Sequence, residues 1–121
     1  MNKQLIAESF SIGRFEGIYP CLSDSIEWNI VGEDTIMGVE SVISKCEETS
    51  AYFKSVTTKF TIKNIIIENH QVVINGVAVF EKNDEISCIN ACDIYSFNES
   101  GLLQKIESYC IAVKEDLLDI Q

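Results

Sequence analysis

Hydrophobic residues in the first half of the chain recur at helical spacing in three places. Residues 5–10 predict a first helix that ends before Gly13, because glycine commonly stops a helix. Residues 15–22 predict a second helix of one or two turns, with Pro20 early in it, where proline is tolerated best. Residues 39–53 place apolar side chains along one face of a third helix.

The remaining apolar residues alternate with polar ones, as is typical of strands. Residues 23–32 predict one strand ahead of the third helix. Four longer strands follow that helix, separated by short polar turns, at residues 59–68, 71–81, 86–97 and 102–113. Strands joined in this way form an antiparallel meander. Helices followed by a curved, mainly antiparallel sheet predict an α+β fold, and 121 residues suit a single domain over residues 1–121.

Both faces of the predicted sheet carry apolar side chains. Three short helices cannot cover its concave face without leaving a cleft. On the outer face, Tyr109, Ile111 and Val113 share one parity of the last strand. An exposed apolar sheet face indicates a partner, and we expect a homodimer through this face.

The charge of the chain argues against two classes of partner. The net charge is −10, the pI is about 4.4, and the nine basic residues are scattered singly. Nucleic acids and anionic membrane surfaces are bound by clustered Lys and Arg, so we expect neither. No apolar run approaches 18 residues, and the first ten residues lack the features of a secretory signal. We therefore expect a cytoplasmic protein that does not span a membrane.

The cysteines show no metal-binding pattern. An odd number, five, without a signal peptide indicates reduced thiols that pack as small hydrophobic residues. Cys88 and Cys92 are four apart on a predicted strand, about 13 Å from each other, which is too far for a disulfide or a shared metal. The single histidine, His70, lies beside a predicted turn. We expect no metal and no cofactor.

Three segments together resemble a known family. They are GRFEGIYPCLSDSIEWNIVG at residues 13–32, MGVESVISKC at 37–46, and ACDIYSFNESGLLQKIESYCI at 91–111. Their order and spacing resemble the SnoaL-like group of the nuclear transport factor 2-like superfamily. The resemblance implies a cone, in which a strongly curved sheet wraps around three N-terminal helices and leaves a pocket at its open end. The superfamily includes isomerases, polyketide cyclases, epoxide hydrolases, dehydratases and non-catalytic domains, so the fold alone does not select a function.

The resemblance can be carried over one residue at a time. The segment around Asp93 resembles the stretch of ketosteroid isomerase that holds its oxyanion-hole aspartate. The other groups of that enzyme do not carry over, since Asn29 stands at the position of the general base and Ile6 near that of the tyrosine donor. In the comparison with limonene epoxide hydrolase, Ser108 stands where that enzyme has an aspartate, and Arg14 is the single arginine available. A cyclase that relies on Asp93 alone remains compatible.

Asp93 is the residue whose role matters most. An ionised carboxylate in an apolar strand is unfavourable unless it is paired, hydrogen-bonded or protonated. Three roles stay open: a packed structural acid, a polar anchor for a ligand, and a catalytic acid/base. The catalytic role requires a shifted pKa, which an apolar cone would raise. No histidine or lysine is visibly placed to cooperate with Asp93.

Strand alternation predicts which residues line the pocket. Residues 89–97 of odd number are expected to share the concave face with residues 74–80 and 106–112 of even number, and at least one of Trp28 and Asn29 is expected to face inward. The predicted pocket comprises Tyr19, Trp28, Asn29, Cys46, Gly76, Ala78, Ala91, Asp93, Tyr95, Ser108 and Cys110.

Apolar walls with a few polar points are typical of a small-molecule site. We therefore expect a SnoaL-like protein that binds a small apolar or amphipathic molecule. Two alternatives stay open. One is an isomerase, cyclase or dehydratase that uses Asp93 as acid/base or oxyanion donor, and the other is a non-catalytic interaction module that acts through the sheet face.

Overall fold

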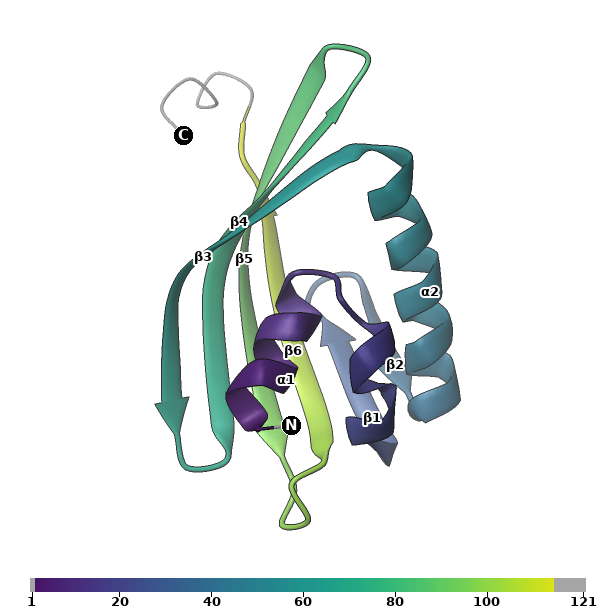
Figure 1. The fold of residues 1–121 in the computed structure, drawn as a ribbon, viewed down its shortest axis with the longest axis vertical. Helices are drawn as coiled ribbons and strands as arrows, with labels where there is room; N and C mark the ends of the chain where they lie inside the picture. Colours follow the sequence, from purple (N-terminus) through teal and green to yellow (C-terminus); the bar gives the residue numbers. More distant parts are fainter. Residues whose placement is uncertain (1, 115–121) are drawn as a thin grey trace.

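The computed structural model describes residues 2–114. Its helices and strands follow the order α1 (Lys3–Ser11), the 3-10 helix η1 (Glu16–Cys21), β1 (Leu22–Ile30), β2 (Asp34–Met37), α2 (Val39–Ser55), β3 (Thr57–Glu68), β4 (Gln71–Lys82), β5 (Glu85–Phe97) and β6 (Leu103–Ala112). The strands form one sheet in the order β2-β1-β6-β5-β4-β3, and every neighbouring pair is antiparallel except β1 and β6. The sheet curves around the helices, which all lie on its concave side (Figure 1).

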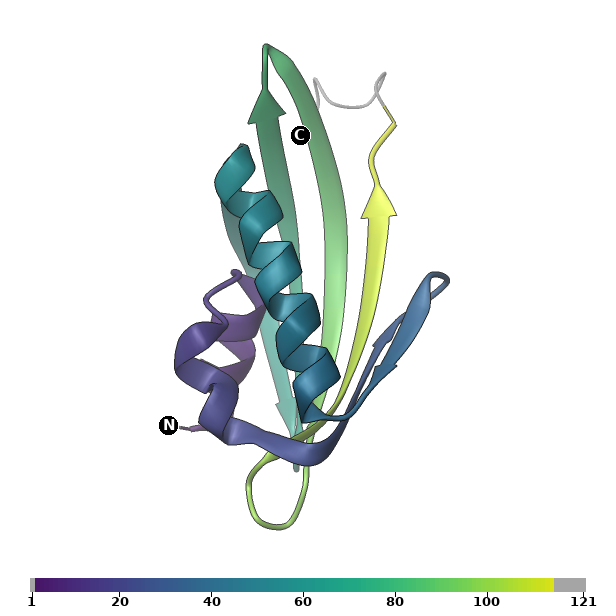
Figure 2. The same ribbon diagram turned by 90° about the vertical axis from the view of Figure 1, so that its right-hand side faces the viewer.

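The predicted α+β architecture is confirmed, including the meander of the last four strands. Figure 2 shows the long strands bending past α1 and α2 without closing into a barrel. Two local predictions were wrong. Strand β2 was missed because four mostly exposed residues are too short to show alternation. Pro20 lies late in η1, because a 3-10 helix this short loses little when one backbone donor is missing.

Helix α1 is fixed on the concave face by its cap and its apolar stripe. The Asn2 side chain accepts a hydrogen bond of 2.8 Å from the backbone N–H of Leu5, which satisfies one free donor of the first turn. Ile6, Ala7 and Phe10 are buried beneath the helix. The helix thereby brings its last residues over the middle of the sheet.

Helix α2 closes the other side of the cone. It buries Val42 and Cys46, and its Phe53 ring stacks near Phe15 and Phe80. Gly13, between α1 and η1, has a φ of +79°, and an added Cβ there would lie 2.9 Å from the Phe53 ring. Glycine therefore suits this turn, which has a positive φ and approaches Phe53 of α2 closely.

A second structural reason favours glycine at position 76 on β4. The register of β3 against β4 shifts between Ile62 and Asn64, which marks a β-bulge. A Cβ on Gly76 would lie 2.6 Å from the carbonyl oxygen of Thr61. The glycine thus lets the bulged strand approach β4 closely, in addition to leaving space in the cone.

None of the helices within residues 2–114 is long and apolar enough to cross a membrane.

Candidate functional site

The strand register brings the predicted concave residues together. Asp93 on β5 lies between Ile74 on β4 and Ser108 on β6. Ala91 lies between Gly76 and Cys110 in the same way. Because successive residues alternate between faces, this register places the predicted sets of β4, β5 and β6 on one surface, facing the helices.

A cavity of about 290 Å³ lies between this surface and the helices. Of the predicted pocket residues, six line it: Trp28, Ala78, Ala91, Asp93, Ser108 and Cys110. Much of its wall is aromatic, formed by Phe10, Phe15, Trp28, Phe53 and Phe80. A smaller space of about 50 Å³ continues beside Asp93 toward Gly76 and the bulged strand.

The aromatic side chains support one another by edge-to-face contacts. The Phe10 ring lies 4.9 Å from Trp28, 5.0 Å from Phe15 and 5.8 Å from Tyr95, all at steep angles. Such pairs hold their rings in defined orientations. These contacts fix the orientation of the Phe10 ring within the cavity wall.

Asp93 is held by hydroxyl groups. Ser11, at the end of α1, donates a hydrogen bond of 3.1 Å to Asp93 Oδ2, and its oxygen lies 2.6 Å from the Tyr95 hydroxyl. Ser108 also hydrogen-bonds the carboxyl group from the neighbouring strand. Ser108 in turn accepts a hydrogen bond of 3.0 Å from Trp28 Nε1.

Burial raises the pKa of Asp93 above its ordinary value of 3.8, because the charged form is poorly solvated in the apolar cone. The hydrogen bonds from Ser108, Ser11 and Tyr95 act in the opposite direction, since they favour the carboxylate. Burial is the stronger effect. The site thus holds an acid that is easier to protonate than a surface aspartate.

Neighbouring groups titrate far from neutral pH. Burial, assisted by the charge of Asp93, raises the pKa of the Tyr95 hydroxyl well above its usual value. The same two causes, with a contribution from Glu33, raise the pKa of Cys110 to about 11. The thiol lining the cavity is therefore a neutral, weakly nucleophilic group.

Four predicted pocket residues lie elsewhere. Asn29 follows Trp28 on β1 and thus points to the outer face, where its Oδ1 accepts a hydrogen bond of 3.3 Å from Thr35. Cys46 is completely buried in the core beneath α2. Tyr19 lines a separate groove outside the cone, and burial is the main cause that raises its pKa to about 12.

Tyr95, the fourth, is completely buried and does not line the cavity, but its hydroxyl interacts with Ser11 and with Asp93. Gly76 lines the small space beside Asp93 rather than the main cavity.

Several lining residues were not found from the sequence. Lys45, Thr49 and Phe53 of α2 all line the cavity, and their spacing of four residues was the available signal that they share a helix face. Lys45 thus places a lysine at the cavity, where the sequence predicted none beside Asp93. It forms an ion pair of 3.5 Å with Glu48. For Ser11 and Glu33 the sequence holds no comparable signal.

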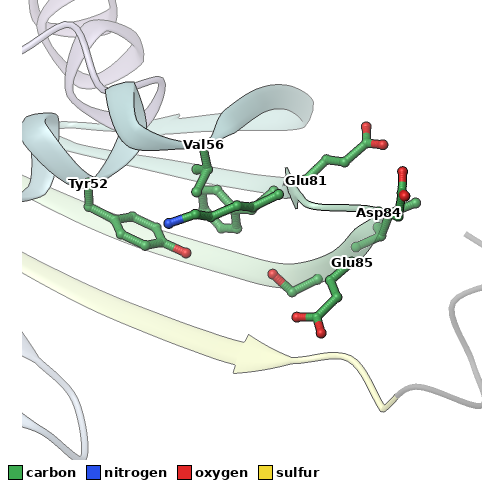
Figure 3. Close-up of a pocket in the computed structure, with 9 residues that line it drawn as sticks. Tyr52, Val56, Glu81, Asp84 and Glu85 are labelled. Carbon is green, nitrogen blue, oxygen red and sulfur yellow. The ribbon is translucent and has the colours of Figure 1, made fainter.

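A larger, open groove of about 600 Å³ lies at the far end of α2, against the β4–β5 hairpin (Figure 3). Tyr52 lies at one end, and the carboxylates of Glu81 and Asp84 point away from it. Phe80 lines both this groove and the inner cavity, with its ring 5.6 Å from that of Tyr52. The groove is wider but carries no buried polar group comparable to Asp93, so the inner cavity is the better candidate site.

The chain is similar to several solved structures. It is 34% identical to an NTF2-like protein of unknown function from Cytophaga hutchinsonii, with a TM-score of 0.83 over 89% of this chain and 95% of that one. A protein from Jannaschia sp. CCS1, named as a SnoaL-like polyketide cyclase, is 10% identical with a TM-score of 0.70 over 97% of this chain and 87% of that one.

An LEH-like epoxide hydrolase from M. tuberculosis is 13% identical, with a TM-score of 0.67 over 88% of this chain and 77% of that one. No known family model and no curated protein matches the sequence. The cyclase and hydrolase likenesses concern the fold, whereas the first similarity extends to the sequence.

Proposed function

The chain belongs to the NTF2-like family, and from this premise we propose that it binds a small, largely apolar molecule in the cavity beside Asp93. The observation that carries the proposal is a cavity of about 290 Å³ with aromatic walls and one partly buried acid. A water molecule occupies roughly 30 Å³ in the liquid, so the cavity suits a ligand of about ten to fifteen non-hydrogen atoms. Apolar walls with a few placed polar groups are the usual composition of such sites.

Asp93 supplies the polar anchor in this proposal. With its pKa raised by burial, the acid is available in its neutral form, which presents an O–H donor to the cavity. A neutral acceptor such as a ketone oxygen is the complementary group. The aromatic wall formed by Phe10 and Trp28 then contacts the hydrocarbon part of the ligand.

The bicyclic ketone α-tetralone and its parent hydrocarbon tetralin test this anchor. We expect calorimetry to show tighter binding of the ketone, with an affinity that falls about tenfold per pH unit once pH exceeds the pKa of Asp93. In Asp93→Asn, an amide donor replaces the acid at every pH, so binding should become independent of pH. Equal binding of the two compounds, or an unchanged pH profile in Asp93→Asn, would contradict the anchor.

A second candidate is an acid/base enzyme of the isomerase, cyclase or dehydratase class. The raised pKa of Asp93 favours it, and Glu33 and Lys45 line the same cavity. An enzyme of this kind would exchange the protons beside the ketone group for deuterium in D₂O, and Asp93→Asn would abolish the exchange. Binding without exchange is what we expect, because the protein's own hydroxyls already engage Asp93.

We also propose a homodimer through the convex sheet face. Three large apolar side chains are exposed on that face: Ile66, Tyr109 and Ile111. Burial of such a surface against a second copy would stabilise both. A pure interaction module would use this same face and leave the cavity without a ligand.

We also propose that the protein is cytoplasmic. All five cysteines are unpaired in the structure, which suits a reducing compartment.

A further inference from the structure

Trp28 and Ser108 form a buried hydrogen-bonded pair in the wall of the cavity. Trp28 is 6% exposed and Ser108 is 3% exposed, and the Trp28 Nε1 lies 3.0 Å from the Ser108 oxygen. An indole N–H can only donate, so Ser108 accepts this hydrogen bond. The hydroxyl hydrogen of Ser108 is then free to point toward Asp93, which lies opposite it on the neighbouring strand.

A second chain of hydroxyls reaches Asp93 from the other side, but its direction can reverse. When Ser11 donates to Asp93 Oδ2, its oxygen accepts from the Tyr95 hydroxyl, 2.6 Å away. When Asp93 is protonated, both hydroxyls can rotate so that Ser11 accepts from the acid and donates to Tyr95. The pair formed by Trp28 and Ser108 cannot reverse in the same way, because the indole cannot accept the Ser108 hydrogen and occupies one of the two lone pairs of the Ser108 oxygen.

We propose that Trp28 is a positioning residue that acts through Ser108 to set which way the hydrogen bonds of Asp93 point. This inference rests on the proposed function, since it concerns the acid that would anchor the ligand. With Trp28 in place, one lone pair of the Ser108 oxygen is occupied, and donation from Ser108 to Asp93 is favoured over acceptance of the acid proton. The acid proton is left to the ligand or to Ser11. Without the indole N–H, Ser108 can turn and accept that proton, and the ligand then loses its donor.

The ionisation of Asp93 can be measured separately from that of the tyrosine and the two thiols nearest to it. The titratable or charged groups around it are Tyr95 and Cys92 on β5, Cys110 on β6, Glu33 before β2 and Lys45 on α2. Burial raises the pKa of the tyrosine and of both thiols, so these three groups remain neutral where Asp93 titrates.

The test is a carbon-13 NMR titration of the Asp93 carboxyl group in the ligand-free protein, with the signal assigned by Asp93→Asn. Trp28→Phe keeps an aromatic ring and removes the N–H. We expect it to raise the pKa of Asp93 by about half to one pH unit, because the carboxylate loses an oriented donor. Ser108→Ala should raise it by a similar amount, and the double variant should add nothing further.

Phe15→Leu is the packing control, since Phe15 lines the same cavity without a side-chain hydrogen bond. It should leave the pKa of Asp93 unchanged, and the amide spectra of all variants should show the native fold. An unchanged pKa in Trp28→Phe, or effects of Trp28→Phe and Ser108→Ala that add in full, would overturn the inference. If Trp28→Phe does not fold, Ser108→Ala still decides: an unchanged pKa in that variant overturns the inference as well.

A second readout ties the pair to the ligand. Below the pKa of Asp93, Trp28→Phe should bind α-tetralone about three- to tenfold more weakly than the parent protein, while binding of tetralin changes equally in Trp28→Phe and Phe15→Leu. Failure of the parent protein to bind either compound would count against the proposed function. The NMR titration of Asp93 in the ligand-free protein would still test the role of Trp28 independently.

Discussion

At the scale of single residues, the site depends on Asp93, whose pKa is shifted in opposite directions by burial and by hydrogen bonds. Burial raises the pKa of Asp93, and hydrogen bonds from Ser108, Ser11 and Tyr95 lower it. A purely structural acid would be expected to have its charge fully compensated. The net upward shift instead leaves an acid that is easier to protonate than an exposed aspartate, and shifts of this kind are common where an acid has a functional role.

The raised pKa of Asp93 predicts how Asp93→Asn changes stability with pH. A group whose pKa is higher in the folded than in the unfolded state stabilises the fold at low pH, and this contribution is lost as pH rises from about 4 through the folded-state pKa. Asp93→Asn has no ionisable group at this position, so its stability does not fall with pH for this reason. Urea unfolding between pH 4 and pH 8 should therefore show the variant becoming more stable relative to the parent as pH increases.

Asp24→Asn, at an exposed position of β1, controls for the same change in net charge. A loss of stability in Asp93→Asn that is large and equal at every pH would identify Asp93 as a structural acid instead.

At the scale of elements, the concave surface could be predicted from the sequence because its period is short and its turns are local. A strand places every second residue on one face, so Asp93 and Ser108 were placed on the same surface without knowledge of the fold. The orientation of helices could not be read in this way. Which side of α2 faces the cavity depends on its packing against β1. The sequence therefore did not predict that Lys45 and Thr49 line the cavity. The choice between Trp28 and Asn29 depended on the parallel pairing of β1 with β6, a contact between distant segments.

The bulge between β3 and β4 predicts a position-specific effect of alanine. A Cβ on Gly76 would lie 2.6 Å from the Thr61 carbonyl oxygen, a backbone atom that cannot rotate away. Gly76→Ala should lower the free energy of unfolding by about 1–3 kcal/mol, as overpacking does elsewhere.

Gly17→Ala is the matched control, because nothing lies within 4 Å of a Cβ at Gly17. It should leave the stability unchanged or raise the free energy of unfolding by at most about 1 kcal/mol. Equal effects of the two substitutions in urea unfolding would argue against the close approach at the bulge.

At the scale of the whole molecule, the sheet separates two surfaces with different roles. Its concave face is covered by the helices (Figure 1). The cavity lies between that face and the helices. Its convex face is not covered by any helix of the described chain (Figure 2). A dimer through the convex face would leave the cavity open in each copy.

The proposed dimer predicts that one charge on the convex face is enough to separate the copies. Ile111 is 66% exposed, so Ile111→Lys should not disturb the core but should place a charge in the apolar interface. Sedimentation analysis should show a dimer for the parent protein and a monomer for the variant. Leu5→Lys, on the exposed side of α1, should remain dimeric. A monomeric parent protein would contradict the proposal.

The central claim, that the cone holds a binding cavity, is tested most directly by methyl NMR of alanine-labelled protein titrated with α-tetralone. Ala78 and Ala91 line the cavity, Ala7 is buried in the core, and Ala51 is exposed on α2. We predict saturable shifts of the Ala78 and Ala91 methyl signals, with little change at Ala51. If those two signals stay fixed up to the solubility limit of the ketone, or move no more than that of Ala51, the account of this cavity as a ligand site is contradicted.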